Sequence, residues 1–360
     1  MKSKQNSKYP ILYIHLMSII WLLARCDHGI TKTSDGCPSF CNCSSWSISC
    51  SRSDLTKLPN IKFTFVGNLK SLIINNTSIR KIKTRSFVDY PELIVLNVTS
   101  SLIETIEIDA FCGLPHLTNL SLEANRLQVI TKGSFNCLAN LKEMMLRSNA
   151  LVHIESKAFC TLENLQYLIL DNNRLKAMSQ GDFGCLLNLK TLRLKHNAIS
   201  TIETNSLCGL QSLNRLNLKG NRLKIVKNDS LACLSSLEDI YLEFNRIEDI
   251  EPNSFSNLTK LRMLDIAGNK LKTIHRGAFA GLSSVKHLNI NKNKLSKISN
   301  GSLACLSELK GLSICSNEIS TLDEDAFKPT KEVKEISLVD NKLSTIRTDY
   351  FSNLGNLEFL

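Results

Sequence analysis

The sequence predicts an α/β solenoid, a coil of stacked units whose short strands join into one parallel sheet. Three observations support this prediction: a strict period of 24 residues, a leucine step of period two at the same place in each unit, and an asparagine soon after it. The pattern L-x-x-L-x-L-x-x-N-x-L begins at residue 69 and recurs every 24 residues up to 357, without an insertion. Residues 69–360 are therefore expected to form twelve full repeats and the start of a thirteenth.

The leucine step predicts a short strand in each repeat. Leu120 and Leu122 alternate with other residues, which is typical of a strand with one buried face. A strand of this length is not stable alone, so the neighbouring repeats must supply its hydrogen-bond partners. Large apolar residues later in the repeat, such as Phe111 and Phe135, are expected to fill the opposite wall of the coil.

The recurring asparagine, as at Asn125 and Asn173, is polar at a position that points inward. Burying an amide is costly unless its hydrogen bonds are satisfied. We therefore expect an asparagine ladder, in which each side chain hydrogen-bonds to the backbone of neighbouring turns. Thr77 and Ser101 replace asparagine in the first two repeats, where a smaller polar side chain can take the same role.

The composition indicates a folded chain. A hydrophobic content of 43% with 21% charged residues excludes a disordered tail and a multi-span membrane protein. The formal net charge of +11 falls by four, to +7, without the basic residues of the first 25 positions. An excess of this size does not by itself predict a nucleic-acid partner.

Residues 1–29 have the layout of a secretory signal peptide. Three lysines precede an apolar run over residues 11–23, and small or polar residues follow it. The run is short for a membrane span, which needs about 20 residues, although an uncleaved anchor is the alternative. We expect the protein to be extracellular or on the cell surface, with cleavage open among Ala24, Cys26 and Gly29.

The 13 cysteines favour an oxidising compartment. Four of them lie close together, at Cys37, Cys41, Cys43 and Cys50. Zinc binding is the alternative, but no histidine lies near and the spacing does not match the usual paired ligands. We expect two disulfides here and no metal.

Together these features resemble the extracellular leucine-rich repeat family, whose "typical" 24-residue repeats follow a cysteine-rich cap in members such as Slit and the Nogo receptor. The resemblance covers residues 37–360 and implies a curved horseshoe. In that fold a parallel sheet lines the concave side, and loops or short helices form the convex side. The resemblance also implies a cap over residues 37–68 with disulfides Cys37–Cys43 and Cys41–Cys50. Membership of the family does not select a ligand.

The end of the sequence bears on the prediction because a solenoid needs a terminal cap over its last core face. The sequence stops three residues into a thirteenth repeat. We therefore expect the chain to be incomplete, with a cap, a membrane tether or a further domain possible only beyond residue 360.

Six further cysteines alternate along the repeats. In each pair one cysteine stands nineteen residues into a repeat and the other twenty residues into the next: Cys112 and Cys137, Cys160 and Cys185, Cys208 and Cys233. Adjacent strands lie about 4.8 Å apart, so each pair could meet the Cα separation of about 4.4–6.8 Å that a disulfide needs. Inter-repeat disulfides and buried reduced thiols both stay open. Cys305 and Cys315 have no evident mates.

Sequons predict N-glycosylation wherever the asparagine is exposed in a secreted protein. The expected acceptors are Asn76, Asn97, Asn119, Asn228, Asn257 and Asn300. Asn75 and Asn42 also begin sequons, but Asn42 lies between two cysteines. Sugars at positions 75, 97 and 119 would block the concave face of the first three repeats.

The outward strand positions, two, four and six residues into each repeat, can vary without touching the core, and we expect them to carry recognition. Repeats four to seven place Met145, Arg147, Tyr167, Ile169, Asp171, Arg193, Lys195, Arg215, Asn217 and Lys219 there. The charged residues are mainly basic up to repeat seven and acidic from repeat eight. Repeats eight to ten place Asp239, Tyr241, Glu243, Met263, Asp265 and His287 at these positions, and Phe244 comes just beyond them. Exposed aromatic and arginine side chains are enriched in binding hot spots, which predicts a protein ligand across repeats four to ten. A solvated surface of mixed charge is the alternative.

Catalytic motifs are absent from the sequence, including G-x-S-x-G, H-E-x-x-H and phosphate-binding glycine loops. We therefore expect neither an enzyme nor a cofactor. A basic cluster of Arg193, Lys195, His196, Arg215 and Lys219 could bind a sulfated glycan by charge; export argues against nucleic acid.

The sequence favours the ligand-binding ectodomain of a cell-surface receptor or adhesion protein. A secreted matrix or guidance protein of the Slit type is the alternative, as is the accessory repeat domain of a larger enzyme. Sequence beyond residue 360 would distinguish these classes.

Overall fold

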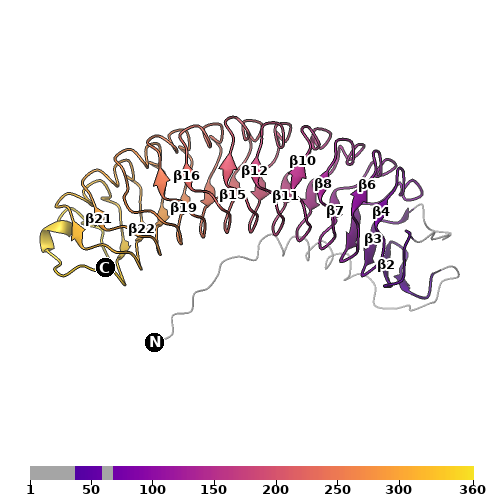
Figure 1. Cartoon of the computed structure of the whole chain (residues 1–360), viewed down its shortest axis with the longest axis horizontal. Helices are drawn as coiled ribbons and strands as arrows, with labels where there is room; N and C mark the ends of the chain where they lie inside the picture. Colours follow the sequence, from indigo (N-terminus) through magenta and orange to yellow (C-terminus); the bar gives the residue numbers. More distant parts are fainter. Residues whose placement is uncertain (1–36, 59–67) are drawn as a thin grey trace.

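The computed structural model describes residues 37–58 and 68–360. These residues form a curved solenoid with short strands along its inner edge (Figure 1). The curved horseshoe expected from the sequence is therefore confirmed. The predicted signal peptide, residues 1–29, and part of the predicted cap lie outside the described residues.

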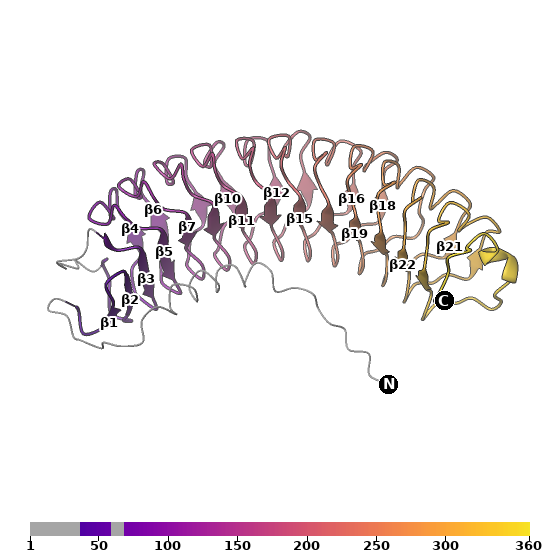
Figure 2. The same cartoon turned by 180° about the vertical axis from the view of Figure 1, so that it is seen from behind.

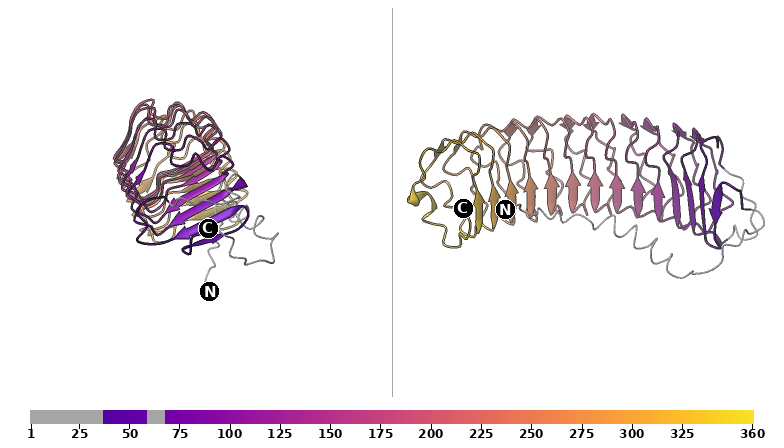
Figure 3. Two further views of the ribbon diagram at one scale, coloured as in Figure 1. Left: turned by 90° about the vertical axis from the view of Figure 1, so that its right-hand side faces the viewer. Right: turned by 90° about the horizontal axis from the view of Figure 1, so that it is seen from below.

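One sheet of 14 strands lines the concave side, and its strands stand side by side along the arc (Figure 3, right). In the cap, β1 (Cys41–Cys43) pairs antiparallel with β2 (Ser47–Ser51), and every later pair in the sheet is parallel. The remaining strands are β3 (Ser71–Asn75), β5 (Val95–Thr99), β7 (Asn119–Ser121), β9 (Glu143–Met145), β11 (Tyr167–Ile169), β13 (Thr191–Arg193), β15 (Arg215–Asn217), β17 (Asp239–Tyr241), β19 (Met263–Asp265), β20 (His287–Asn289), β22 (Gly311–Ser313) and β24 (Glu335–Ser337). Leu168 of β11 lies opposite Leu192 of β13, so the register follows the 24-residue period.

Turns and very short strands make up the rest of each repeat. Pairs of two-residue strands form five small parallel sheets: β4 (Lys81–Ile82) with β6 (Thr105–Ile106), β8 (Val129–Ile130) with β10 (His153–Ile154), β12 (Ala177–Met178) with β14 (Thr201–Ile202), β16 (Ile225–Val226) with β18 (Asp249–Ile250), and β21 (Lys297–Ile298) with β23 (Thr321–Leu322). The 3-10 helix η2 (Thr348–Phe351) lies at the end opposite the cap (Figure 2). Either loops or short helices are expected on the convex side, and the described repeats have loops there. Over the described ranges, no helix has the length and apolar character that a membrane crossing requires.

The core is a continuous row of leucines faced by a row of phenylalanines. Leu122, Leu170 and Leu218 are fully buried, as the repeat pattern predicts. On the opposite wall, the rings of Phe111 and Phe135 stack with their centroids 5.9 Å apart. The buried leucines of all the repeats belong to one hydrophobic cluster, so the repeats share one core, and truncating such a residue to alanine typically costs about 2–5 kcal/mol.

The predicted asparagine ladder is present. The side-chain Nδ2 of Asn221 donates hydrogen bonds to the carbonyls of Leu194 and Leu218, both at 2.9 Å, and its Oδ1 accepts the Ile199 N–H at 3.0 Å. The same arrangement holds at Asn125, Asn149, Asn173, Asn197, Asn245, Asn269, Asn293, Asn317 and Asn341. Each amide is thus satisfied by the backbone of neighbouring turns, and the burial penalty is offset.

The smaller residues at the start of the ladder take the expected role. The hydroxyl oxygens of Thr77 and Ser101 lie 2.8 Å apart, and the Thr77 N–H donates to the Ser101 hydroxyl at 3.1 Å. The ladder therefore continues toward the cap with hydroxyl groups in place of amides.

Disulfides tie the cap and three pairs of repeats. In the cap, Cys37 bonds to Cys43 and Cys41 to Cys50. Three further disulfides, named here the inter-repeat staples, are Cys112–Cys137, Cys160–Cys185 and Cys208–Cys233, with Cα separations of 4.8–5.0 Å. The thiols are therefore bonded and not reduced, whereas Cys305 and Cys315 are free.

A candidate protein-binding face on the concave sheet

The concave sheet brings side chains of successive repeats into rows. Because β15, β17 and β19 pair in register, Arg215 lies beside Asp239 and Asp239 beside Met263. Strands in a sheet are about 4.8 Å apart, so side chains on one face contact their neighbours in the next repeat. The strands of repeats four to ten, which carry or precede the predicted residues, are thus consecutive in one sheet (Figure 3, right).

Ion pairs join opposite charges across the repeats of this face. Arg193 pairs with Asp171, whose second oxygen accepts the Lys195 N–H at 2.8 Å. Arg215 Nη2 lies 2.7 Å from Asp239 Oδ2. The predicted basic cluster is therefore neutralised in part by the acidic residues of the adjacent repeats.

The prediction that every outward position is exposed is wrong for four side chains. Asp171, Ile169, Glu243 and Tyr241 retain only 2–8% of their accessible surface. Ile169 and Tyr241 are nevertheless outside the hydrophobic core cluster, and each lies opposite a residue of the adjacent strand, Arg193 and Asn217. In-register strands are close enough for long side chains of one repeat to lie over those of the next, and this crowding is the physical reason.

The other predicted residues remain accessible. Arg147, His287 and Phe244 are exposed, the last with 50% of its surface. Partly accessible side chains are Met145, Tyr167, Arg193, Lys195, Arg215, Lys219, Asp239, Met263 and Asp265. Each of the repeats from four to ten therefore offers at least one fully or partly accessible side chain to a partner.

Two carboxyl groups lie close together on repeats eight and nine. Asp265 accepts the Ala267 N–H at 3.0 Å through Oδ1 and the Asn289 Nδ2 at 3.1 Å through Oδ2. Burial, followed by the charge of Glu243, raises the pKa of Asp265 to about 6. Glu243 receives Lys219 Nζ at 3.2 Å on Oε1, whereas its buried Oε2 has no hydrogen-bond partner among the described residues.

An aromatic ring lies next to these carboxyl groups. Lys219 Nζ is 5.1 Å from the centroid of Phe244, within cation–π distance. The ring lies over Gly268, where an added Cβ would approach Phe244 Cδ1 to 2.7 Å and where φ is +66°. A side chain at position 268 would push the ring aside, so the ring can lie there because the next repeat has glycine at this position.

Sequence reasoning missed this ring-on-glycine contact, although a signal exists. Phe244 and His196 both stand seven residues into a repeat, and the following repeat has glycine at the same position, Gly268 and Gly220. The His196 ring lies against Gly220 as Phe244 does against Gly268. Burial, followed by the charge of Lys195, lowers the pKa of His196, so its imidazole resists protonation.

The sequons divide into two groups. Asn97 and Asn119 are half-buried on the concave strands, and the Asn119 Nδ2 donates to Glu143 Oε2 at 2.8 Å. The other predicted acceptors, Asn76, Asn228, Asn257 and Asn300, are exposed. Glycosylation of any of them stays a prediction; exposure favours the second group.

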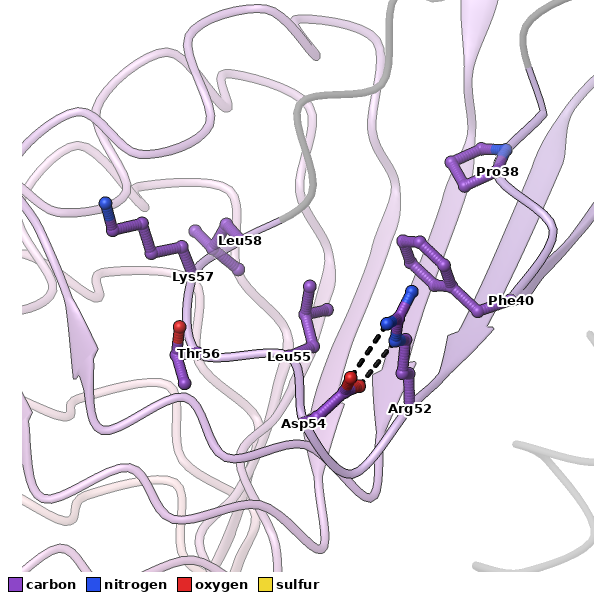
Figure 4. A pocket seen from close by; sticks show the side chains of 8 residues that line it. All are labelled: Pro38, Phe40, Arg52, Asp54, Leu55, Thr56, Lys57 and Leu58. Carbon is purple, nitrogen blue, oxygen red and sulfur yellow. Dashed lines mark hydrogen bonds and ion pairs between the residues drawn. The ribbon is translucent and has the colours of Figure 1, made fainter.

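Two other features do not form part of this face. A depression in the cap is lined by Phe40, Arg52 and Asp54 among others, and Arg52 pairs with Asp54 beneath the Phe40 ring (Figure 4). Asp109 lies beside Cys112 and Cys137. Because those two sulfurs are bonded to each other, they are not available as thiolate ligands.

Comparisons with known proteins agree with this architecture. The family described as Leucine rich repeat matches residues 67–127, 115–175 and 163–223, and the family described as BspA type Leucine rich repeat region matches residues 224–358. No curated protein sequence matches the chain.

Solved structures with the same fold include receptor chains. A chain of the TLR13–ssRNA13 complex has a TM-score of 0.67 at 22% identity, with 81% of this chain and 49% of that chain covered. A chain of the glycosylated Toll–Spatzle complex of Drosophila has a TM-score of 0.75 at 21% identity, with 85% of this chain and 43% of that chain covered. A chain of the octameric complex of Latrophilin 3, Unc5D and FLRT2 has a TM-score of 0.69 at 20% identity, with 88% of this chain and 99% of that chain covered. The chain thus spans less than half of the first two matched chains, and these likenesses show the fold alone.

Proposed function

Because the chain belongs to the leucine-rich repeat family, we propose that it is a non-catalytic module that binds a protein ligand through the concave face of repeats four to ten. The observation that carries this proposal is a row of accessible basic, acidic and aromatic side chains along one continuous sheet. Arg147, Phe244 and His287 are exposed there on a scaffold held by the ladder and the shared core. Rigid scaffolds with exposed aromatic and arginine side chains favour specific binding, because little conformational entropy is lost.

The neighbours in structure support a protein ligand. Toll was solved with Spatzle, and FLRT2 with Unc5D and Latrophilin 3, whereas TLR13 was solved with single-stranded RNA. On the present chain Arg193, Arg215 and Lys219 are paired with acidic side chains. This pairing favours a protein of mixed charge over a sulfated glycan or a nucleic acid, which would need unpaired basic groups.

We place the protein in the secretory pathway, at the cell surface or outside the cell. The five disulfides found among the described residues support this placement, because such bonds persist in oxidising compartments. A receptor or adhesion ectodomain is the proposed class, and a secreted matrix or guidance protein is its alternative.

The test is an array of purified extracellular domains probed with the full chain, followed by affinity measurement on each domain that binds. Arg147→Glu combined with Phe244→Ala should weaken the dissociation constant at least about tenfold, because both side chains are exposed on the proposed face. Leu187→Ala is the matched control, since Leu187 is 51% exposed and lies outside the concave strands. Equal affinity of the double variant and the control for every domain captured would contradict the proposal.

A further inference from the structure

A buried oxygen without a partner marks one place on the concave face. Glu243 keeps 7% of its surface, and its Oε2 accepts no hydrogen bond from the described part of the chain. A buried carboxylate oxygen normally has a donor, because removing the charge from water is costly. Of the two carboxylate oxygens of Glu243, only Oε1 therefore has a hydrogen-bond donor.

The cation that does reach Glu243 belongs to the preceding repeat. Lys219 Nζ lies 3.2 Å from Glu243 Oε1 and 5.1 Å from the Phe244 ring centroid. One ammonium group thus contacts a carboxylate and an aromatic face together, which shows that the geometry fits a nitrogen cation. Lysine has a flexible stem and no fixed direction of donation, and the side chain of Lys219 is 31% exposed, so it has solvent into which it can move.

We propose that Lys219, Glu243, Phe244 and Asp265 form an arginine site, in which an arginine of the protein ligand displaces Lys219 and binds Glu243 through both carboxylate oxygens. The inference rests on the proposed function. A planar guanidinium offers two parallel N–H donors, so it can satisfy Oε1 and Oε2 where the ammonium satisfies one. Its flat face can also stack on Phe244, half of which is open to solvent.

The surrounding charges favour a cation with hydrogen-bond donors. Asp265 adds a second carboxylate on the next strand, and the charge of Glu243 already raises its pKa. Asp239, the third acidic residue nearby, is held by Arg215. Displacing Lys219 leaves Glu243 and Asp265 with two negative charges for one incoming guanidinium.

A metal ion suits the same residues less well. Calcium takes about six to eight oxygen ligands, whereas Asp265 already accepts two hydrogen bonds and Lys219 occupies one oxygen of Glu243. Calcium also gains nothing from an aromatic ring beside it. The position of Phe244 over Gly268 is therefore explained better by an organic cation.

Acidification should release the arginine. The groups near Asp265 are Asp239 and Tyr241 of β17, Glu243 just after β17, His287 and Asn289 of β20, and Lys219 after β15. As the pH falls through about 6, Asp265 takes up a proton and the site loses one negative charge.

The probe for this site is the tripeptide acetyl-Gly-Arg-Gly-amide, compared with the same peptide carrying uncharged citrulline. Saturation-transfer NMR with the full chain should detect binding of the arginine peptide, with a dissociation constant on the order of millimolar and at least about fivefold weaker binding of citrulline. Glu243→Gln should abolish the difference between the peptides. Glu335→Gln is the matched control on the same sheet, because Glu335 is exposed on β24, and it should leave the difference unchanged.

Two variants separate displacement from simple attraction. Lys219→Gln should strengthen binding of the arginine peptide several-fold, because the resident cation no longer competes. Should this variant fail to fold, Phe244→Ala alters only an exposed ring and should weaken binding several-fold. Circular dichroism and thermal melting check that each variant is folded.

Several results would overturn the arginine site. They are equal binding of the two peptides, weaker binding after Lys219→Gln in a folded protein, or calcium chloride that displaces the peptide with micromolar potency. If the arginine site fails while Arg147→Glu still weakens protein capture, only this inference is lost, because Arg147 lies in repeat four. If both fail, the proposed function is lost as well.

Discussion

At the scale of single residues, Asp265 is predicted to make stability depend on pH. Its folded pKa is raised to about 6, above the ordinary value of 3.8, because burial and Glu243 disfavour the charged form. The folded state therefore holds the proton more tightly than the unfolded chain, and the free energy of unfolding falls as the pH rises from about 4 to above 6. Asp265→Asn should remove this penalty and raise stability by about 1–2 kcal/mol at pH 7.5.

Urea denaturation at pH 7.5 and pH 4 measures this effect. At pH 4 the folded carboxyl is protonated and the unfolded one, with its ordinary pKa of 3.8, is only about half ionised, so the variant and the parent should differ by no more than about 0.5 kcal/mol. Asp325→Asn is the control, because Asp325 pairs with Lys328 on the surface and should change stability by less than about 0.5 kcal/mol at either pH. A gain at pH 4 as large as the gain at pH 7.5 would show that Asp265 acts through packing and not through its charge.

The residues of the concave face could be located from the sequence, but their accessibility could not. The period fixes that Tyr241 and Ile169 stand on the outward side of their strands. Their burial depends on which neighbouring side chains lie over them, and the pattern of one repeat carries no information on that. The contact of Lys219 with Phe244 likewise joins two repeats.

At the scale of secondary-structure elements, the sequence predicts the concave strands well because each is tied to the repeat. A leucine at period two and an asparagine after it specify the strand and the turn. The two-residue strands, such as β8 and β10, were not predicted, since a single aliphatic residue such as Ile130 does not distinguish a loop from a short strand. The spacing of the six repeat cysteines does not distinguish disulfides from reduced thiols, because that depends on distances between repeats, which are 4.8–5.0 Å between the paired Cα atoms.

The same geometry predicts that a fourth inter-repeat staple can be introduced. Cys305 stands twenty residues into its repeat, like Cys137, and has a similar positive φ, 75° against 69°. The position that would hold its mate is Ala280, whose N–H donates to the Gly277 carbonyl as the Cys112 N–H donates to Asp109. Ala280→Cys should therefore form a disulfide with Cys305 and raise stability by about 1–3 kcal/mol.

Thiol titration under denaturing conditions checks this prediction. In protein that lacks residues 1–29, and with them Cys26, the parent should show the two free thiols of Cys305 and Cys315, and Ala280→Cys should show one. Ser256→Cys is the matched control, because Ser256 occupies the same position in the preceding repeat but the position of its mate is Gly281. It should show three thiols, and three thiols in Ala280→Cys as well would refute the proposed pairing.

At the scale of the whole molecule, each repeat contacts only its neighbours. The sheet, the ladder and the core all link one repeat to the next, as in other solenoids. The inter-repeat staples add a second level, because they join repeats two with three, four with five and six with seven, while the described repeats beyond residue 236 have no disulfide. Local stability is therefore expected to vary along the arc.

Hydrogen exchange with mass spectrometry can map this variation. In Cys160→Ala with Cys185→Ala, the backbone amides of residues 141–188 should exchange about tenfold or more faster, because the loop constraint on the locally opened state is lost. Amides of residues 285–332 should keep their rates, since no contact links these repeats directly. The cap disulfides stay intact in this variant, so the change cannot come from the cap. Uniformly faster exchange along the chain would instead mean that the repeats open as one cooperative unit, and the nearest-neighbour account of stability would be wrong.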